Sequence, residues 1–233
     1  LGSVPRSLKT PLNTHNVNVT GFLNVIEAAR LAKVKRFVFA ASSSTYGDNE
    51  ALPKIESEIG RPLSPYAVTK LINELYAEVY KQSFDFDSIG LRYFNVFGPK
   101  QDPNGAYAAV IPKFVSSLLQ GKSPVINGDG SFSRDYTYVD NVVEANLLAL
   151  TTSNKRALNE IYNIAFGERT TLIELVNLLK ERLLNYDSSL AKIKPEFGPE
   201  RPGDVPHSLA SIQKAINLLG YNPHCDISEG LTK

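Results

Sequence analysis

The chain has 233 residues, 42% of them hydrophobic and 21% charged, which is typical of folded globular proteins and excludes a disordered one. With 25 basic and 24 acidic residues, its net charge of +1 gives no reason to expect nucleic acid or an anionic membrane as a partner. No apolar run is long enough to cross a bilayer, no signal segment opens the chain, and the single Cys225 cannot form an internal disulfide, so a cytoplasmic protein is expected.

The first element predicted is a helix with apolar residues at helical spacing from about Val17 to Ala32. The polar residues 13–16 before it are suited to cap its N-terminus. A continuous apolar run over residues 36–41 then predicts a strand that is covered on both faces, as in a parallel sheet.

A polar segment over residues 42–61 predicts a loop, and its length indicates a functional one. Ser64 and Pro65 then suit the N-cap and the first position of a helix that runs to about Gln82. Residues 87–93 predict the next strand. This alternation of helix and strand is typical of a doubly wound α/β fold.

The second half of the chain has a looser pattern. Helices are predicted at about 110–120, 139–151, 172–184 and 211–219, and strands at 161–164 and near 192–195. We expect the strand at 161–164 to return to the first sheet. The expected domains are 1–98 completed by about 137–165, and a smaller α/β lobe formed by 99–136 and 166–233.

Tyr66 and Lys70 form the pattern that carries chemistry. Their i, i+4 spacing places a phenol and an ammonium on one face of the helix, in its first turns. The ammonium and the helix N-terminus favour a phenolate, so we expect a lowered pKa for Tyr66. Such a tyrosine can take a proton from a hydroxyl while a hydride leaves the same carbon. The alternative interpretation of this pattern has no catalytic role: a tyrosine packed against the protein beside a lysine whose side chain lies in solvent.

Ser42 follows the first strand, at the edge of the sheet where doubly wound folds bind ligands. It is placed to hydrogen-bond the same substrate oxygen and relay the proton. By contrast, His15, His207 and His224 have no metal-ligand spacing, and Cys225 has no neighbour in sequence that would lower its pKa. No metal site is expected.

Residues 41–48 (ASSSTYGD), 64–70 (SPYAVTK) and 91–99 (LRYFNVFGP) resemble three motifs of one known family. The chain resembles the extended short-chain dehydrogenase/reductases that act on nucleotide sugars, the NAD-dependent epimerases and dehydratases. Within that family it is most similar to UDP-N-acetylglucosamine 4-epimerases. The resemblance covers essentially the whole chain.

The resemblance implies a Rossmann-type fold, a tightly held NAD and epimerisation at C4 through a 4-keto sugar. Tyr66 would be the catalytic base, Ser42 its assistant, and Lys70 would bind the nicotinamide ribose. The further cofactor contacts it implies are Asn18 and Tyr93. The substrate contacts it implies are Ser3, Ser43, Ser44, Asn95, Val110, Val125, Asn127, Arg134, Arg201, Asp204 and Ser208. Homodimerisation through the helices near Val17 and Ser64 is also implied.

Two departures from related enzymes sharpen this expectation. Sugar 4,6-dehydratases carry an Asp-Glu pair directly after the catalytic Ser or Thr, where this chain has Ser43 and Ser44. Elimination of water therefore lacks its acid and base. Ser208 stands where members restricted to non-acetylated sugars carry a bulky Tyr. A serine leaves room for an N-acetyl group, so UDP-GlcNAc and UDP-GalNAc are the expected substrates.

The Gly-x-x-Gly-x-x-Gly turn that cradles the cofactor pyrophosphate in this family does not occur in the sequence, which also has no methionine. We therefore expect an N-terminally truncated fragment that is inactive by itself. Two alternatives stay open: an epimerase or decarboxylase of non-acetylated UDP-sugars or UDP-uronic acids, and a non-catalytic half-protein that binds UDP-sugars.

Overall fold

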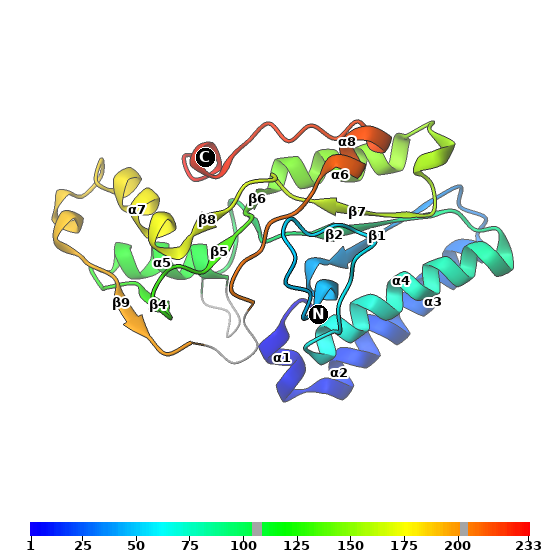
Figure 1. Cartoon of the computed structure of the whole chain (residues 1–233), viewed down its shortest axis with the longest axis horizontal. Helices are drawn as coiled ribbons and strands as arrows, with labels where there is room; N and C mark the ends of the chain where they lie inside the picture. Colours follow the sequence, from blue (N-terminus) through cyan, green and yellow to red (C-terminus); the bar gives the residue numbers. More distant parts are fainter. Residues whose placement is uncertain (104–108, 201–204) are drawn as a thin grey trace.

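A computed structural model describes residues 1–103, 109–200 and 205–233. No helix in these ranges is both long enough and apolar enough to cross a membrane. The molecule has two lobes, a sheet covered by helices and a smaller α/β lobe, which lie side by side in Figure 1. The expected α/β class is confirmed.

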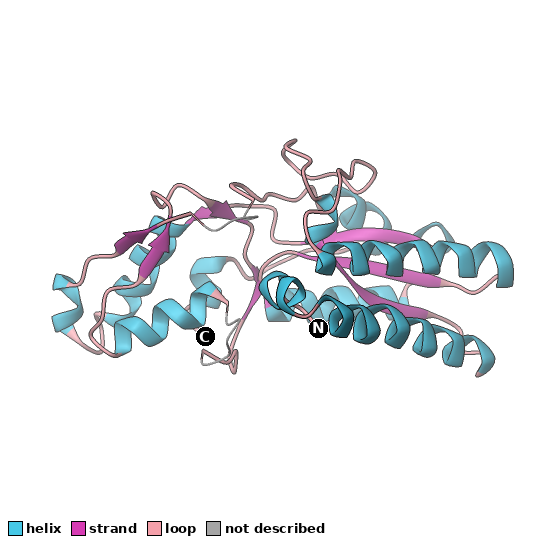
Figure 2. Ribbon diagram, turned by 90° about the horizontal axis from the view of Figure 1, so that it is seen from below, coloured by secondary structure: helices cyan, strands magenta, loops and turns pink. Residues whose placement is uncertain are grey.

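The larger lobe is built on a parallel sheet. Its strands in the described residues are β1 (Phe37–Ser42), β2 (Ser88–Tyr93) and β7 (Glu160–Ile164), in the order β1-β2-β7. The register pairs Ser42 with Tyr93 and Tyr93 with Ile164, so the three strands end at one edge. The predicted return of the chain to the first sheet is therefore confirmed. Figure 2 shows helices on both sides of these strands.

On one face of the sheet lies α4 (Pro65–Phe84), whose N-cap is as predicted. The hydroxyl of Ser64 accepts a hydrogen bond from the backbone N–H of Ala67 at 3.1 Å, and Pro65 occupies the first position. On the other face lies α6 (Val139–Thr151), which the sequence located correctly. Buried Ile89, Leu91 and Tyr162 join apolar residues of α6 in the main core.

The N-terminal helices differ from the prediction at their start. A helical run of α2 (Pro11–His15), the π-helix η1 (Asn16–Thr20) and α3 (Gly21–Leu31) follows the short α1 (Val4–Lys9). Residues 13–16 therefore lie inside a helix and do not cap one, because Pro11 takes the first position of α2. Val25 on α3 and Val68, Leu75 and Val79 on α4 are exposed, and homodimerisation through these helices stays a prediction.

The smaller lobe surrounds a second core containing Phe114 of α5 (Val110–Leu119), Ile126 of β4 (Val125–Asn127) and Leu175 of α7 (Leu172–Leu183). Strand β4 pairs with β9 (Glu196–Gly198), whereas the sequence had predicted this strand near 192–195. The prediction was wrong because residues 188–192 form a 3-10 helix, η4 (Ser188–Lys192), whose N-cap is the Asp187 side chain.

The lobes are linked by several crossings of the chain. The remaining elements are η2 (Ser43–Tyr46), β3 (Val96–Phe97), β5 (Ser133–Arg134), β6 (Thr137–Tyr138), η3 (Lys155–Ala157), β8 (Thr170–Thr171), α8 (Gln213–Leu219) and α9 (Ile227–Gly230). Ala215 and Leu219 of α8 pack in the main core with β2, β7 and α6. The expected assignment of all of 166–233 to the smaller lobe was therefore wrong for α8, whose apolar face completes the cover of the sheet.

Candidate active site

The predicted catalytic residues meet at the carboxyl edge of the sheet. Ser42 is the last residue of β1, and Tyr66 and Lys70 lie in the first turns of α4, which packs on that strand. The ammonium of Lys70 donates to the backbone carbonyl of Ala40 at 2.9 Å. This bond fixes α4 against the end of β1, and Ser42 is hydrogen-bonded to the Tyr66 hydroxyl.

Three hydroxyl groups, those of Ser44, Ser42 and Tyr66, form a chain that ends at Tyr66. Ser42 is buried and caps η2, and its Oγ accepts from the Ser44 backbone N–H at 3.2 Å and from the Ser44 hydroxyl at 2.9 Å. A hydroxyl has two acceptor lone pairs and one proton to donate. Because Ser44 occupies both lone pairs, the proton of Ser42 is left for Tyr66. This geometry can stabilise a phenolate at Tyr66, which is the form that accepts a proton directly from a substrate hydroxyl.

The expected lowering of the Tyr66 pKa was wrong for the chain by itself. Burial raises the pKa of Tyr66, and the hydrogen bond from Ser42 offsets this only in part. Lys70 does not act on the phenol as expected, because its ammonium is directed to the Ala40 carbonyl. Burial lowers the pKa of Lys70, and the charge of Glu74 opposes this effect.

Asn18 and Ser3 lie near this edge but are engaged within the protein. Asn18 is buried in the π-helix η1, and its side-chain N–H group donates to Thr69 Oγ1 of α4 at 3.1 Å. Short π-helical segments are frequent at functional sites. Ser3 is the N-cap of α1, accepting from the Arg6 backbone N–H at 3.1 Å. The next residue, Val4, lines the cavity described below.

Tyr93 is directed to the other face of the sheet. Its neighbour Arg92 pairs with Glu74 of α4, and successive side chains of a strand point to opposite faces. The Tyr93 hydroxyl accordingly donates to the Asn146 side chain of α6 at 3.0 Å. The structure therefore does not bring the Tyr93 side chain to Tyr66 and Lys70, and its cofactor contact stays a prediction.

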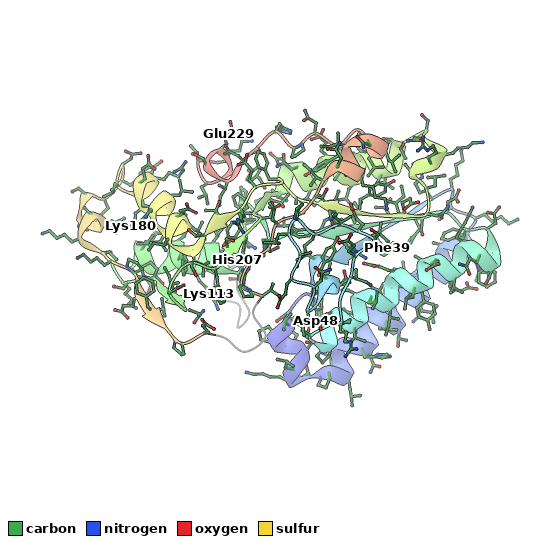
Figure 3. All side chains as sticks on the ribbon, in the orientation of Figure 1. Phe39, Asp48, Lys113, Lys180, His207 and Glu229 are labelled. Carbon is green, nitrogen blue, oxygen red and sulfur yellow. The ribbon has the colours of Figure 1, made fainter. Side chains whose placement is uncertain are left out.

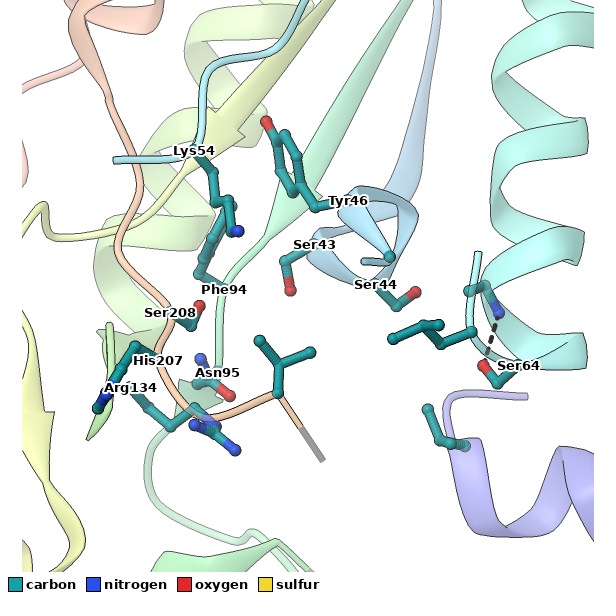
Figure 4. Close-up of a pocket in the computed structure, with 15 residues that line it drawn as sticks. Ser43, Ser44, Tyr46, Lys54, Ser64, Phe94, Asn95, Arg134, His207 and Ser208 are labelled. Carbon is teal, nitrogen blue, oxygen red and sulfur yellow. Dashed lines mark hydrogen bonds between the residues drawn. The ribbon is translucent and has the colours of Figure 1, made fainter. Parts of the chain in front are cut away.

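A cavity of about 220 Å³, the proximal cavity, lies next to the catalytic residues. Figure 4 shows it between η2, the start of α4 and the segment around Ser208. It gathers five residues that the sequence had predicted as substrate contacts: Ser43, Ser44, Asn95, Arg134 and Ser208. Ser43 and Ser44 line one side of it, with Asn95, Arg134 and Ser208 across from them (Figure 4).

Two further cavities, the distal cavities, continue from it into the smaller lobe. The first, of about 260 Å³, shares Asn95 and Arg134 with the proximal cavity. The second, of about 370 Å³, shares Val110 and Asn127 with the first, and Val125 also lines it. Because they share lining residues, these cavities lie next to one another in a row from the catalytic edge into the smaller lobe, and this row is called the groove below. Arg201 and Asp204 lie outside the described residues.

Asn95 and Arg134 stand where the cavities join. Asn95 has a φ of 33°, in the left-handed region, and its side chain donates to the Asp135 carbonyl at 3.1 Å. Backbone strain of this kind is concentrated at functional sites. The guanidinium of Arg134 donates from Nη1 to the carbonyls of Ser133 and Pro206, at 2.9 and 3.0 Å. These bonds hold a cation at the junction, which suits an anionic ligand such as a diphosphate.

Among the lining residues of the proximal cavity that the sequence analysis missed, two carry basic side chains, Lys54 and His207. His207, labelled between the lobes in Figure 3, is exposed, and its Nδ1 lies 3.0 Å from the Ser133 hydroxyl. Lys54 is buried although it belongs to the polar loop. Its only sequence signal was a position within a loop of functional length, which does not single out one residue.

Residues 1–165 match the model of the NAD dependent epimerase/dehydratase family. The chain is 35% identical over 232 residues to a putative UDP-glucose 4-epimerase of Methanocaldococcus jannaschii, covering 99% of this chain and 72% of that protein. Among solved structures, it is 39% identical, with a TM-score of 0.92, to the UDP-N-acetylglucosamine 4-epimerase of Methanobrevibacter ruminantium M1 in complex with UDP-N-acetylmuramic acid, over 100% of this chain and 72% of that one. The UDP-glucose 4-epimerase of Thermotoga maritima with UDP-glucose gives a TM-score of 0.91 at 38% identity, over 99% and 72% of the two chains.

Proposed function

The chain belongs to the NAD dependent epimerase/dehydratase family, and from that membership we propose that it serves epimerisation at C4 of a UDP-N-acetylhexosamine, interconverting UDP-GlcNAc and UDP-GalNAc. One observation carries the proposal. A single cavity beside Ser42 and Tyr66 is lined by the small side chains of Ser43, Ser44 and Ser208. These small side chains leave space in the cavity for an acetamido group. No pair of carboxyl groups stands next to Ser42.

NAD is the cofactor of this family, and when bound it supplies the acceptor and donor of the C4 hydride. The residues at the sheet edge fit such a group. Lys70 offers an ammonium at the end of β1, suited to ribose hydroxyls, and buried Asn18 lies beside α4 through its bond to Thr69. In the proposed reaction Lys70 would leave or share its bond to Ala40 to reach the ribose.

Tyr66 and Ser42 would handle the proton of the sugar 4-hydroxyl. The substrate oxygen would lie against the Tyr66 hydroxyl, so that Tyr66 takes the proton as the hydride leaves C4 and returns it when the hydride comes back. The bond from Ser44 fixes Ser42 with its proton toward Tyr66, which stabilises the phenolate. The reaction needs the phenolate, so binding of substrate and cofactor must offset the effect of burial on Tyr66.

The nucleotide would lie along the rest of the groove. Arg134 and Asn95 at the junction of the cavities would hold the diphosphate, and Val110, Val125 and Asn127 in the distal cavities would surround the uracil. A guanidinium suits phosphate oxygens, and an amide suits the polar edge of a base. Arg201 and Asp204 are proposed for the diphosphate and the ribose on the resemblance alone.

Ser43 and Ser44 separate this proposal from elimination of water across the sugar. Elimination needs an acid and a base that exchange a proton with carbon and oxygen. Serine hydroxyls do not titrate near neutral pH, and Ser44 is already bonded to Ser42. The side chains next to Ser42 therefore favour a reaction that returns the hydride to the same carbon.

The test compares turnover of UDP-GlcNAc and UDP-Glc by the full gene product that contains this chain, with NAD supplied. We expect a higher kcat/KM for UDP-GlcNAc. In Ser208→Tyr the phenol fills the proximal cavity near Ser43, so turnover of UDP-GlcNAc is expected to fall at least about 100-fold while UDP-Glc is retained.

Preference for UDP-Glc in the unmutated protein would contradict the proposed substrate and favour an enzyme of non-acetylated sugars. Binding of UDP-sugars without turnover of any of them would favour the non-catalytic alternative. The matched control is Ser131→Tyr, since Ser131 is an exposed serine of the same lobe that lines none of the three cavities.

A further inference from the structure

A second cavity, the side cavity, adjoins the proximal cavity and has no part in the proposed reaction. It has a volume of about 400 Å³. Five residues line both cavities: Gly47, Lys54, Leu63, Val205 and His207. Lys54 and Ser208 lie on the same side of the proximal cavity in Figure 4, and His207 is the chain neighbour of Ser208. The side cavity therefore begins next to Ser208, where the proposed function places the acetamido group.

The side cavity has a wall of apolar side chains, those of Leu52, Leu63, Val205 and Pro206. Leu52 is 36% exposed and Leu63 is 52% exposed, so much of their apolar surface faces open space. Within the described residues, neither leucine belongs to any of the buried apolar clusters. Apolar surface that stays in contact with water favours an apolar ligand group that can cover it.

The polar residues around the side cavity are engaged in holding the loop after η2. The Asp48 carboxylate accepts from the Arg61 backbone N–H at 2.6 Å, and the Asn49 side chain donates to the Glu58 carbonyl at 2.9 Å. The Lys54 ammonium donates to the Asn49 carbonyl. These bonds fix the shape of the cavity, and they bind polar groups that would otherwise compete for a ligand.

The charges around the side cavity disfavour a negatively charged ligand group. Asp48 and Glu50 bring two carboxylates, whereas Lys54 brings the single ammonium among the described residues that line it. Burial lowers the pKa of Lys54, and the charge of Glu50 opposes this effect, so the ammonium already has a negative charge near it. A further carboxylate would be repelled by Asp48 and Glu50, whereas a neutral group would not.

We propose that the side cavity binds the N-acyl chain of the substrate, so that the site prefers UDP-hexosamines whose acyl group is neutral, unbranched and longer than acetyl, such as butanoyl. The inference rests on the proposed function and names the acyl group of the same substrate. With the amide against Ser208, the added carbons would continue past Val205 toward Leu52. They would leave water and cover apolar side chains, which stabilises the complex.

The test measures binding of UDP, UDP-GlcNAc and its N-butanoyl and N-succinyl analogues by titration calorimetry in the full gene product that contains this chain. Butanoyl has two more methylene groups than acetyl, and each one buried contributes about fourfold in affinity. We therefore expect the butanoyl compound to bind about tenfold more tightly than UDP-GlcNAc. The succinyl chain ends in a carboxylate that would meet Asp48 and Glu50, so it should bind at least about tenfold more weakly than the butanoyl chain.

Leu52 is the position for a variant, because it lines the side cavity and not the proximal cavity. Leu52→Asp should bring the ratio of butanoyl to acetyl affinity close to 1 and leave the Kd of UDP-GlcNAc as it was. Leu52→Ile should keep most of the ratio. The matched control is Leu119→Asp, at an exposed leucine that lines neither cavity, which should leave the ratio unchanged.

A ratio near or below 1 in the unmutated protein, a ratio unchanged in Leu52→Asp, or tighter binding of the succinyl than of the butanoyl compound would overturn the inference. Circular dichroism shows whether each variant folds, and the comparison of the two chains in the unmutated protein decides the matter if Leu52→Asp does not. The two proposals fail separately. If UDP and UDP-GlcNAc do not bind, the proposed function fails, whereas turnover of UDP-GlcNAc without a preference for butanoyl defeats only this inference.

Discussion

Tyr66 is the residue on which the proposed chemistry depends most directly. Tyr66→Phe removes the phenol while keeping the ring, so epimerisation by the full gene product is expected to fall by about 100-fold or more. Binding of the UDP-sugar should change little, because Tyr66 lies beside the proximal cavity and is not among the residues that line it. Steady-state kinetics and calorimetry measure the two effects separately.

The matched control is Tyr76→Phe, the same change farther along α4, where the ring packs with Phe86 and Tyr80 away from the sheet edge. An equal loss of kcat in both variants would show that the effect comes from α4 as a whole. In that case Tyr66 would not be the base.

At the scale of single residues, the sequence predicted which side chains lie together better than it predicted their pKa values. Ser42, Ser44 and Tyr66 do form one hydroxyl chain, because an N-capped helix and a strand end are local features. The pKa of Tyr66 shifted opposite to expectation because burial and the direction of Lys70 depend on the tertiary fold. Lys54 was missed for the same reason, since only the fold buries it.

Among the elements, α4 and β2 are joined by a buried ion pair. The guanidinium of Arg92 donates to both carboxylate oxygens of Glu74, at 2.9 and 2.8 Å, and also lies 4.8 Å from the ring centre of Tyr46. The side chains of Arg92 and Glu74 are 4% and 7% exposed. The pair thus connects the catalytic helix, the sheet and the loop that forms the cavity.

Arg92→Met should therefore lower the free energy of unfolding by about 3–5 kcal/mol, because it leaves the Glu74 carboxylate buried without its partner. Urea denaturation of the purified protein measures this change. The double variant Arg92→Met, Glu74→Met should recover part of the loss, since both charges are then gone. Two results would contradict this expectation. One is a decrease in the free energy of unfolding of less than about 1 kcal/mol in Arg92→Met, and the other is a double variant destabilised by more than the sum of the two single changes.

Element positions were predictable where the local pattern is strong. The start of α4 follows from the capping pair Ser64-Pro65, and the position of α6 follows from its apolar spacing. The start of the N-terminal helices and the position of β9 were wrong, because the π-helix η1 and the 3-10 helix η4 interrupt the regular periods on which such predictions rest.

For the molecule as a whole, Asp135 holds together segments that link the lobes. Its carboxyl group accepts from the backbone N–H groups of Phe166, Gly167 and Ala210, at 3.1 to 3.3 Å, and the side chain is fully buried. These segments follow β7 and precede α8. Burial raises the pKa of Asp135 to about 7, although the three backbone bonds act to lower it.

A pKa that is raised in the folded state predicts stability that is greatest at low pH and lost as the pH rises. An unfolded Asp titrates near about 3.9, so the free energy of unfolding should fall between about pH 4 and pH 7 and level off above. The side chain of Asn does not titrate, so the free energy of unfolding of Asp135→Asn should not show this dependence on pH. Urea denaturation of both proteins from pH 5 to pH 8 gives the difference. A difference independent of pH would show that the backbone bonds outweigh burial.

The alternation of elements predicts two lobes. It does not predict which segments of the two lobes come together around the proximal cavity. Residues of the proximal cavity come from α1, η2, the loop after it, the start of α4, the exit of β2, β5 and the segment before α8. Nothing local in the sequence relates Lys54 to Ser208. Only the resemblance to known enzymes had placed residues of both lobes in one site.

The bridge between Lys54 and Ala210 has a consequence for how the protein acquires its binding site. The two residues are far apart in the chain, and contacts of such long range form late in folding because their loops must close first. The proximal cavity is therefore incomplete in any partly folded form that lacks the segment before α8. A ligand that fills this cavity would then bind the complete native state alone and add its binding free energy to the global stability. Cleavage of the chain near Ala210 would abolish ligand binding even if both pieces kept their helices.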